Sequence, residues 1–275
     1  MTVLSLPPLD LDAAVAPGSG PDDDSPLRSV STAVAVLDCF AEEAELGATR
    51  VAARLGIAKS TACRMLAALA TGGLLERTGS GRYRLGLRLF EYGQLAVDRL
   101  MLRDVALPAM GELRELLRET IQLGVVVGTD VLYVERTEAA SMNVRFRSEH
   151  RRNPAHSSST GRVLAAGDPA LATAILERGF VRYTPFTVVD PQRYRQILAT
   201  TREQGYATSR EEFEPGWSSI AAPITMMRGG RPHPVAALSV VAPTSRVLGH
   251  RKPAVVQGVR RAAARVSADL ERARS

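Results

Sequence analysis

The clearest alternation of apolar and polar positions lies in "AKSTACRMLAALATGG", which runs from Ala58 to Gly73. Arranged with helical periodicity, one side is apolar: Ala58, Ala62, Met65, Leu66 and Leu69. The other side is polar or small: Ser60, Arg64, Ala67 and Thr71, flanked by Lys59 and Thr61. The pattern predicts a helix that packs through one side. Taken alone, such a helix more often has a solvated polar face with Ser60 as its N-cap, so its neighbours decide the function.

Two further helices are predicted before this segment. Ser29 is a candidate N-cap for a helix ending near Glu43, with apolar residues at spacings of three and four: Val30, Ala33, Val34, Leu37 and Phe40. Thr49 is a candidate N-cap for a short helix, "RVAARLG", that ends at Gly56. A tight glycine-containing turn then joins it to the helix at 58–73, which predicts a helix-turn-helix.

The segment after this helix predicts a β-hairpin. In "LLERTGSGRYRLG" two short apolar segments flank "GSG", and Tyr83 and Leu85 alternate with arginines. The hairpin and the three helices predict a winged helix-turn-helix over residues 27–86. Some winged domains bind only proteins, but here Arg77, Arg82 and Arg84 lie close to glycines that let the backbone approach phosphate.

The remaining chain predicts a linker and a second domain of mixed structure. We expect a linker helix over 87–103, then a first helix interrupted at Pro108. Strands are predicted at "IQLGVVVG", "VLYVERT" and "MNVRF", and a hairpin is formed by "SIAAPITMM" and "VAALSVVAP" around "RGGRPH". Asp168-Pro169 and Asp190-Pro191 predict helix starts, and a last helix begins near Pro253. Residues 104–275 therefore predict an α+β domain around an antiparallel sheet.

Charge is unevenly distributed along the chain. Residues 1–26 hold five prolines and five aspartates but no basic residue, which predicts a disordered acidic tail. The formal net charge of +6 therefore corresponds to +11 for the rest of the chain. Residues 50–88 carry eight basic residues against a single acid, Glu76. This concentration around the predicted helix-turn-helix favours a polyanionic partner, although an arginine-rich composition also occurs in high-GC genomes.

Targeting signals and metal motifs give no competing prediction. The N-terminus lacks the basic and apolar order of a secretory signal, and no apolar run approaches the roughly 20 residues of a membrane span. We therefore expect a cytoplasmic protein with no membrane partner. Cys39 and Cys63 lack the spacing and histidine partners of a metal site and are expected as reduced thiols.

The order of several motifs resembles the isocitrate lyase regulator (IclR) family of bacterial transcription factors. The specific segments are "KSTACRML" followed by "YRLG", then "GYATSREEFEPGWSSIAAPI", and the resemblance covers nearly everything after residue 27. It implies an N-terminal winged domain that binds DNA, a linker helix, and a GAF-like C-terminal domain that binds a small effector. It also implies a homodimer or homotetramer that binds palindromic operators, more often as a repressor, beside a catabolic operon.

The residue chemistry assigns roles within the predicted DNA-binding domain. The first turns of a recognition helix lie closest to the bases, where Ser60, Thr61 and Arg64 project. Arg64 is the best candidate base reader, because a guanidinium donates two hydrogen bonds to a guanine edge. The remaining candidates are expected to bind phosphates: Thr49, Arg50, Lys59, Arg82 and Arg84.

The effector site depends more on the resemblance. It implies lining residues in three segments, "NPAHSSSTGRV", "SREEFEPGWSS" and "LSV", namely Asn153, Ser159, Thr160, Ser209, Trp217, Ser219 and Ser239, with Met142 and Arg145 nearby. Hydroxyls and a helix N-terminus suit a carboxylate. Trp217 and Val241 suggest an aromatic or partly apolar acid. Without the resemblance, helix-capping serines and a buried Trp217 would be the better interpretation.

Two other function classes remain open. The first is a hydrolase, with the winged domain as an accessory module. Its candidate site is His156 together with the adjacent serines Ser157, Ser158 and Ser159. An architectural DNA-binding protein without a ligand is the second, although a separate C-terminal core of this size argues against it. The chain has no G-x-S-x-G, H-E-x-x-H, phosphate-loop or dinucleotide motif, so we expect no catalytic residue, metal or cofactor.

Overall fold

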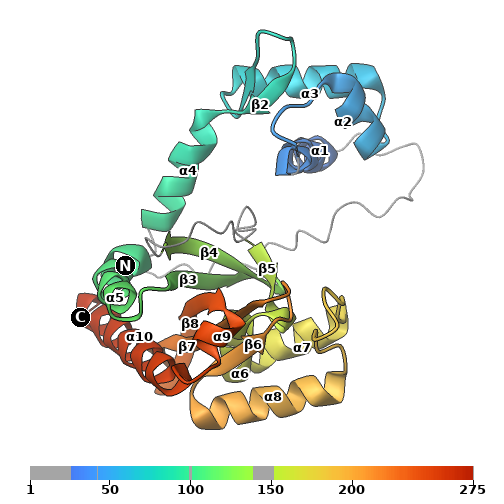
Figure 1. The fold of residues 1–275 in the computed structure, drawn as a ribbon. Coiled ribbons are helices and arrows are strands. Elements are labelled where there is room, and N and C mark those ends of the chain that lie inside the picture. The colour runs from blue at the N-terminus through green and yellow to red at the C-terminus, as the bar shows by residue number, and fades with distance from the viewer. Residues whose placement is uncertain (1–25, 42, 99–100, 139–151, 275) are drawn as a thin grey trace. The chain divides into compact units, whose positions relative to one another are not determined.

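The computed structural model describes residues 26–41, 43–98, 101–138 and 152–274. These residues form two compact units that divide between residues 99 and 100. The first unit is mainly helical, and the second is a sheet flanked by helices (Figure 1).

The first unit is a winged helix-turn-helix, as predicted. Its elements are α1 (Pro26–Asp38), η1 (Cys39–Ala41), α2 (Ala48–Leu55), α3 (Lys59–Thr71), β1 (Leu75–Arg77), β2 (Tyr83–Leu85) and α4 (Leu87–Asp98). The two strands pair antiparallel, and Leu46 adds a bridge to Tyr83. A cluster of buried side chains from α1 to β1 joins the helices, including Val36, Leu46, Val51, Leu66 and Leu75.

The predicted starts of two helices are wrong, and the alternative N-cap for a third is not used. Helix α1 begins at Pro26, so Ser29 lies inside it. Gly47 is the N-cap of α2, which places Thr49 within the first turn, and Ala58 rather than Ser60 is the N-cap of α3. Neither Gly47 nor Ala58 makes a side-chain capping bond. These helices are stabilised by their packed apolar faces, so a local capping preference does not fix where they begin.

The second unit contains a six-stranded antiparallel sheet in the order β5-β4-β3-β8-β7-β6. The strands are β3 (Thr120–Val127), β4 (Asp130–Thr137), β5 (Arg152–Pro154), β6 (Ala207–Arg210), β7 (Trp217–Arg228) and β8 (Arg231–Pro243). The helices are α5 (Leu102–Leu117), η2 (Ala155–Ser157), α6 (Ser159–Gly167), α7 (Pro169–Arg178), α8 (Pro191–Gln204), α9 (Thr244–Val247) and α10 (Lys252–Arg274). The α+β prediction is confirmed, while the predicted strand "MNVRF" lies outside the described residues.

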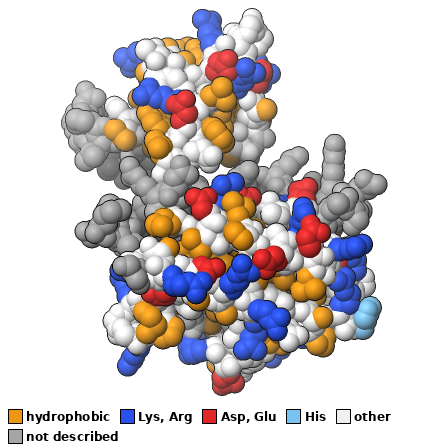
Figure 2. Space-filling view, turned by 90° about the vertical axis from the view of Figure 1, so that its left-hand side faces the viewer, with side chains coloured by type: hydrophobic (Ala, Val, Ile, Leu, Met, Phe, Trp, Pro, Cys, Tyr) orange, Lys and Arg blue, Asp and Glu red, His pale blue; other side chains and the backbone are white. Residues whose placement is uncertain are grey.

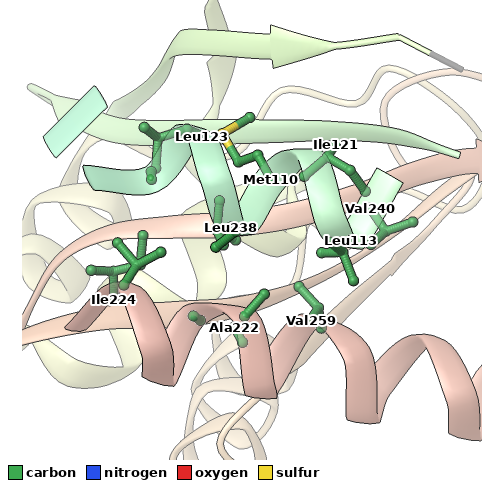
Figure 3. Close-up of a cluster of buried hydrophobic side chains, with 14 of the residues drawn as sticks. Met110, Leu113, Ile121, Leu123, Ala222, Ile224, Leu238, Val240 and Val259 are labelled. Carbon is green, nitrogen blue, oxygen red and sulfur yellow. The ribbon is translucent and has the colours of Figure 1, made fainter. Parts of the chain in front are cut away.

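Helices cover both faces of this sheet. On one face α5 and α10 pack against apolar side chains such as Ile121, Leu123, Leu238 and Val240 (Figure 3). On the other face α6, α7 and α8 form a second core, which includes Tyr194 and Leu198. The predicted stripe of the last helix is confirmed, with these residues buried: Val255, Val259, Ala263, Val266 and Leu270.

Two predictions about the linker region are wrong. Helix α4 ends at Asp98 instead of Arg103, and Pro108 lies inside α5 rather than at a break. Met101, the N-cap of α5, adopts a left-handed conformation with φ of 47°. Buried residues on both sides of Pro108, such as Ala106 and Met110, hold the helix together despite the lost backbone donor.

In the second unit, the helix caps and the turn that were predicted from local sequence are confirmed. The Asp168 carboxylate accepts hydrogen bonds from the N–H groups of Ala170 and Leu171, and Asp190 accepts one from Arg193, as predicted. The predicted hairpin is β7 and β8, joined through Gly229 and Gly230. Both glycines have positive φ, which is the geometry of a two-residue turn between antiparallel strands.

Candidate functional site

The predicted recognition helix presents its polar side to solvent. Helix α3 buries Ala62, Leu66 and Leu69 in the core of the first unit. The opposite side is exposed: Lys59, Ser60, Arg64, Ala67 and Thr71, with Thr61 half-buried. Small residues on this side allow a large surface to approach the helix backbone, as a major groove requires.

The turn before α3 is set by a glycine. Gly56 adopts a left-handed conformation with φ of 64°, and its N–H donates to the carbonyl of Ala52. Only Ile57 then separates Gly56 from the N-cap of α3, so the two helices are connected by a short fixed turn. This turn holds the exposed side of α3 in one orientation relative to α2.

The candidate phosphate-binding residues are exposed, but three of them have protein partners. Arg50 pairs with Glu43 at 3.2 Å and Arg84 with Glu76 at 2.9 Å, while an Arg82 N–H donates to the Glu45 carbonyl. All of these are surface contacts, which are weak in water and readily exchanged for a phosphate. Thr49 and Lys59 are also exposed.

Apolar side chains also remain exposed in the first unit. Helix α1 exposes Val30 and Val34, and helix α4 exposes Leu87, Phe90 and Leu95. Leu87 is 81% exposed and Phe90 is 65% exposed. Figure 2 shows apolar side chains beside basic ones on the surface of this unit.

In the second unit, the sheet face toward α6 is unusually polar. Strand register puts directly paired residues on the same face. One row across the sheet is Arg136, Gln122, Ser239 and Ala221, and the next row is Thr120, Val241, Ser219 and Ser209. Five of the predicted effector residues therefore face α6 or lie at its start: Ser159, Thr160, Ser209, Ser219 and Ser239.

The first turn of α6 lies against this polar face. The Ser158 hydroxyl caps the helix by accepting the Gly161 N–H at 2.9 Å. The Ser159 and Ser219 hydroxyls are 2.7 Å apart, which connects α6 to β7. Gly124 provides the room on β3, since a Cβ there would lie 2.8 Å from Thr160 Cγ2. The Ser209 hydroxyl donates to the Ser157 carbonyl at 2.8 Å.

Two hydroxyls on the polar face are buried without a partner among the described residues. They belong to Thr120, which is 1% exposed, and Ser239, which is 0% exposed. A buried hydroxyl without a hydrogen bond is costly, so native structures usually supply a partner or a ligand. Ser239 was predicted as an effector contact, and Thr120 was not.

Two other residues of this face were also missed by the sequence analysis. Gln122 is 4% exposed, and Arg136 has a side chain that is 18% exposed. Desolvation lowers the pKa of Arg136, against a smaller opposing effect of Glu138. Gln122 interrupts the apolar run "IQLGVVVG", which is the signal that could have drawn attention to it.

The predicted residues Asn153 and Trp217 are half-buried, on β5 and at the start of β7. Burial raises the pKa of Tyr133, while hydrogen bonds with Thr160, Ser158 and Asn153 act in the opposite direction. Asn153 therefore acts on the same tyrosine as the residues at the start of α6. Met142 and Arg145 lie outside the described residues.

A buried ion pair fixes the loop beside the site. The guanidinium of Arg162 on α6 donates to both carboxylate oxygens of Glu212. Nη1 lies 2.6 Å from Oε1, and Nη2 contacts Oε2. The two side chains are 3% and 7% exposed. The Thr184 hydroxyl donates to the Glu211 carbonyl and the Thr187 hydroxyl to the Glu212 carbonyl. These bonds connect the loop after α7 to the loop between β6 and β7, at one end of the polar face.

His156 and Ser159 do not face one another as a catalytic pair. His156 Nε2 lies 3.0 Å from the Val181 carbonyl, and the ring packs between Phe180 and Tyr183. Because a carbonyl oxygen only accepts hydrogen bonds, Nε2 carries the proton. The Ser159 hydroxyl is hydrogen-bonded to the Ser219 hydroxyl instead. In the part of the chain that the structure describes, no three His, Cys, Asp or Glu side chains gather to hold a metal ion.

Two surface cavities lie away from the polar face. One, of about 510 Å³, runs between α5 and α10, and the other, of about 750 Å³, lies beside α10 and β7. Neither is lined by the serines of the polar face. Among the described helices, none combines the length and apolarity needed to cross a membrane.

Comparisons with known proteins agree with this geometry. The chain is 34% identical over 248 residues to the glycerol operon regulatory protein of Streptomyces coelicolor. This match covers 89% of the present chain and 96% of the relative. The chain is also 33% identical over 225 residues to the transcriptional regulator XynR of Escherichia coli, covering 80% and 88%.

A solved structure with similar architecture holds a ligand. It is an IclR homologue from Microbacterium hydrocarbonoxydans complexed with 4-hydroxybenzoate, with a TM-score of 0.76 and 33% identity. The match covers 89% of this chain and 99% of that one.

Two family models match the two units. The IclR helix-turn-helix domain matches residues 29–79, and the bacterial transcriptional regulator IclR C-terminal domain matches residues 94–268. The first match covers most of α1 and all of the winged unit through β1, and the second covers nearly all of the sheet unit. The chain therefore belongs to the IclR family of bacterial transcriptional regulators.

Proposed function

We propose that this regulator represses a catabolic operon by binding a palindromic operator, and that a small organic acid changes this binding. Residues 27–86 bind DNA, residues 87–103 connect the units and residues 104–275 bind the effector. The observation that carries the DNA-binding part is the exposed polar side of α3, whose opposite side is anchored in the core. Chromosomal DNA as the partner places the protein in the cytoplasm.

Within the DNA-binding unit, Arg64 reads a guanine, while Ser60 and Thr61 contact neighbouring base edges or phosphates. Each guanidinium-to-guanine contact contributes about 1–3 kcal/mol of discrimination against a wrong base. Thr49, Arg50, Lys59, Arg82 and Arg84 bind phosphates and fix the register. Their contribution is electrostatic, so it weakens as salt concentration rises.

The test compares Arg64→Ala with Arg50→Ala, using fluorescence anisotropy on the operator and on random DNA of the same length. Arg64→Ala is expected to weaken operator binding by about tenfold or more while random DNA is little affected. Arg50→Ala is the matched control and weakens both by similar factors. Equal losses on the two DNAs for Arg64→Ala would overturn the base-reading role.

The effector is proposed to bind against the polar sheet face, with its carboxylate at the N-terminus of α6. Backbone N–H groups and the helix dipole favour an anion there. Hydroxyls of Ser159, Thr160, Ser209, Ser219 and Ser239 surround this position, with Asn153 and Trp217 at its edge and Met142 and Arg145 as further candidates. Trp217 and Val241 favour an aromatic or partly apolar acid, and 4-hydroxybenzoate in the related structure is such an acid.

Calorimetry tests the effector class. We expect 4-hydroxybenzoate or a similar aromatic acid to bind more tightly than glyoxylate or pyruvate. Tight binding of the two small acids together with no binding of hydroxybenzoates would reject the aromatic preference. A footprint and an operator affinity that do not change with any bound acid would reject the coupling, since a ligand shifts an equilibrium only through different affinities for two states.

The protein is proposed to act without catalysis or a cofactor and as a homo-oligomer. His156 Nε2 lies against the Val181 carbonyl and the Ser159 hydroxyl against that of Ser219, so the two do not make the nucleophile–base contact that a serine hydrolase would need. Exposed apolar side chains on α1 and α4 supply a surface for a second copy. A two-fold symmetric dimer matches the two half-sites of a palindrome.

A further inference from the structure

An acidic segment, residues 1–25, precedes the winged unit in the chain. It lies outside the described residues. It has no basic residue, and its acids are Asp10, Asp12, Asp22, Asp23 and Asp24. Helix α1 begins at Pro26, so the segment is joined directly to the winged unit. No part of the proposed function uses this negative charge.

The winged unit carries exposed basic side chains that its own acids do not neutralise. Two of its carboxylates, Glu43 and Glu76, already pair with other arginines. On α3 and at the end of β1, Lys59, Arg64 and Arg77 are exposed, and no carboxylate of the described residues pairs with them. These three residues therefore form an unneutralised basic surface that attracts an anionic segment.

The acidic segment is long enough to reach this basic surface. About 16 residues separate Asp10 from Pro26, and a flexible chain of this length spans about 20 Å on average and about 55 Å when extended. A compact unit of about 70 residues has a radius of gyration of only about 11 Å. Covalent attachment also keeps the segment at a millimolar effective concentration, so weak individual ion pairs are sufficient for binding.

We propose that the acidic segment binds the exposed basic residues of α3 and β1 in the same chain and competes there with DNA. This inference rests on the proposed DNA-binding role of α3 and the wing. DNA phosphates occupy the surface only after the aspartates have left it. Operator and random DNA both need these phosphate contacts, so the competition weakens both by the same factor.

The positions of the lysines allow a direct test of the contact in the full chain. The sequence has two lysines, Lys59 at the start of α3 and Lys252 at the start of α10. A water-soluble carbodiimide joins a carboxylate to a touching lysine amine as an amide, and takes up the released water as a urea. Because no spacer is added, the product identifies which lysine the acidic segment contacts.

Mass spectrometry is expected to find the acidic segment joined to Lys59, within the single-chain band of a denaturing gel. Random DNA, or salt at about 0.5 M, is expected to suppress this product. Lys252 is the internal control, since α10 is also rich in arginine. Three results would overturn the proposal: a segment joined to Lys252 instead, a Lys59 product found only in a two-chain band, and a segment joined to neither lysine.

Fluorescence anisotropy tests the competition with a full-length variant that carries Asp10→Asn, Asp12→Asn, Asp22→Asn, Asp23→Asn and Asp24→Asn. At about 50 mM salt, this variant is expected to bind operator and random DNA about three- to tenfold more tightly than wild type. At about 0.5 M salt the difference disappears, because the charges are screened. All five positions precede α1, so the substitutions leave the cores of both units unchanged.

The matched control places glutamate at the same five positions, which keeps the charge and the wild-type affinity. An asparagine variant with wild-type affinity, or a glutamate variant that binds as tightly as the asparagine one, overturns the competition. Tighter DNA binding without the Lys59 product indicates repulsion at a distance and overturns the contact.

The outcomes also separate this inference from the proposed DNA-binding surface. If Arg50→Ala and Arg64→Ala both bind operator and random DNA as wild type does, the proposed DNA surface fails. The crosslink is measured without DNA, so it still decides whether the acidic segment contacts α3.

Discussion

Two charged residues of the second unit, Arg162 and Glu212, are buried. Arg162 and Glu212 form a two-point ion pair, and both side chains are almost fully buried. Burying an isolated charge is strongly unfavourable, and in this pair each charge offsets the desolvation cost of the other. The pair also fixes the loop that carries Glu212 against the helix that begins at the effector site.

Glu212→Gln is therefore expected to destabilise the second unit by about 3–5 kcal/mol, because it leaves a buried guanidinium without its anion. Urea unfolding measures this loss. Combining Arg162→Met with Glu212→Leu is expected to recover much of it, since the pair is then replaced by apolar side chains. A single variant as stable as wild type would contradict the role given to this pair.

His156 introduces a pH dependence of stability. Burial lowers the pKa of His156 below its ordinary value of 6.5, although the bond to the Val181 carbonyl acts in the opposite direction. Arg162 and Arg178 also lower it, and Glu212 raises it. The folded state therefore binds a proton less readily than the unfolded state, which favours folding only while the imidazole is neutral.

The stability that His156 provides is expected in full above 6.5, the ordinary value, and is lost as pH falls through the folded-state pKa. His156→Gln is expected to flatten the dependence of the urea midpoint on pH in this acidic range. His250→Gln, at an exposed position, is the control and leaves the wild-type profile. An unchanged profile in the His156 variant would assign the acid sensitivity to other groups.

At the scale of elements, the packing of α6 on the sheet depends on a small residue in β3. A Cβ at Gly124 would lie 2.8 Å from Thr160 Cγ2 and 2.9 Å from Val131 Cγ1, both closer than normal contacts. Neither neighbour is the free end of a flexible chain. A side chain at this position therefore displaces the start of α6, where the effector carboxylate is proposed to bind.

Gly124→Ala is expected to destabilise the protein by about 1–3 kcal/mol through overpacking and to weaken effector binding. Thermal melting and calorimetry measure the two effects. Gly111→Ala is the matched control, because its Cβ would meet nothing within 4 Å on α5. In a helix the added methyl group is expected to be neutral or stabilising by up to about 1 kcal/mol. Equal behaviour of the two variants would refute the close-packing argument.

At the scale of the whole molecule, the exposed apolar side chains of the first unit point to self-association. Leu87, Phe90 and Leu95 on α4 are all more than half exposed, and grouped exposed apolar side chains are typical of protein interaction sites. In the proposed homo-oligomer, a second copy of the chain would bury such a surface symmetrically and present two recognition helices.

Phe90→Glu is expected to shift the protein toward monomer in analytical ultracentrifugation and to weaken palindromic operator binding more than half-site binding. The physical reason is that a charge in an apolar interface loses its hydration without a partner. Glu91→Ala, on the same helix, serves as the control and keeps the wild-type assembly. An unchanged sedimentation coefficient for Phe90→Glu would remove α4 from the interface.

The sequence by itself determined most of the local structure. The helical stripe of α3, the aspartate caps of α7 and α8, and the Gly229-Gly230 turn were predictable because each depends on residues within one or two turns of chain. A helix start without a capping side chain, such as Gly47 before α2, was not predictable, because distant packing and not a local bond decides it.

The tertiary structure alone decided the polar face and its partners. Thr120 and Gln122 meet Ser239 only through the pairing of β3 with β8, and Arg136 joins them only through β4. Arg162 and Glu212 are fifty residues apart in the chain. Sequence periodicity shows which residues share a face of one strand, but strand register, set by contacts distant in sequence, decides which strands bring their polar residues together.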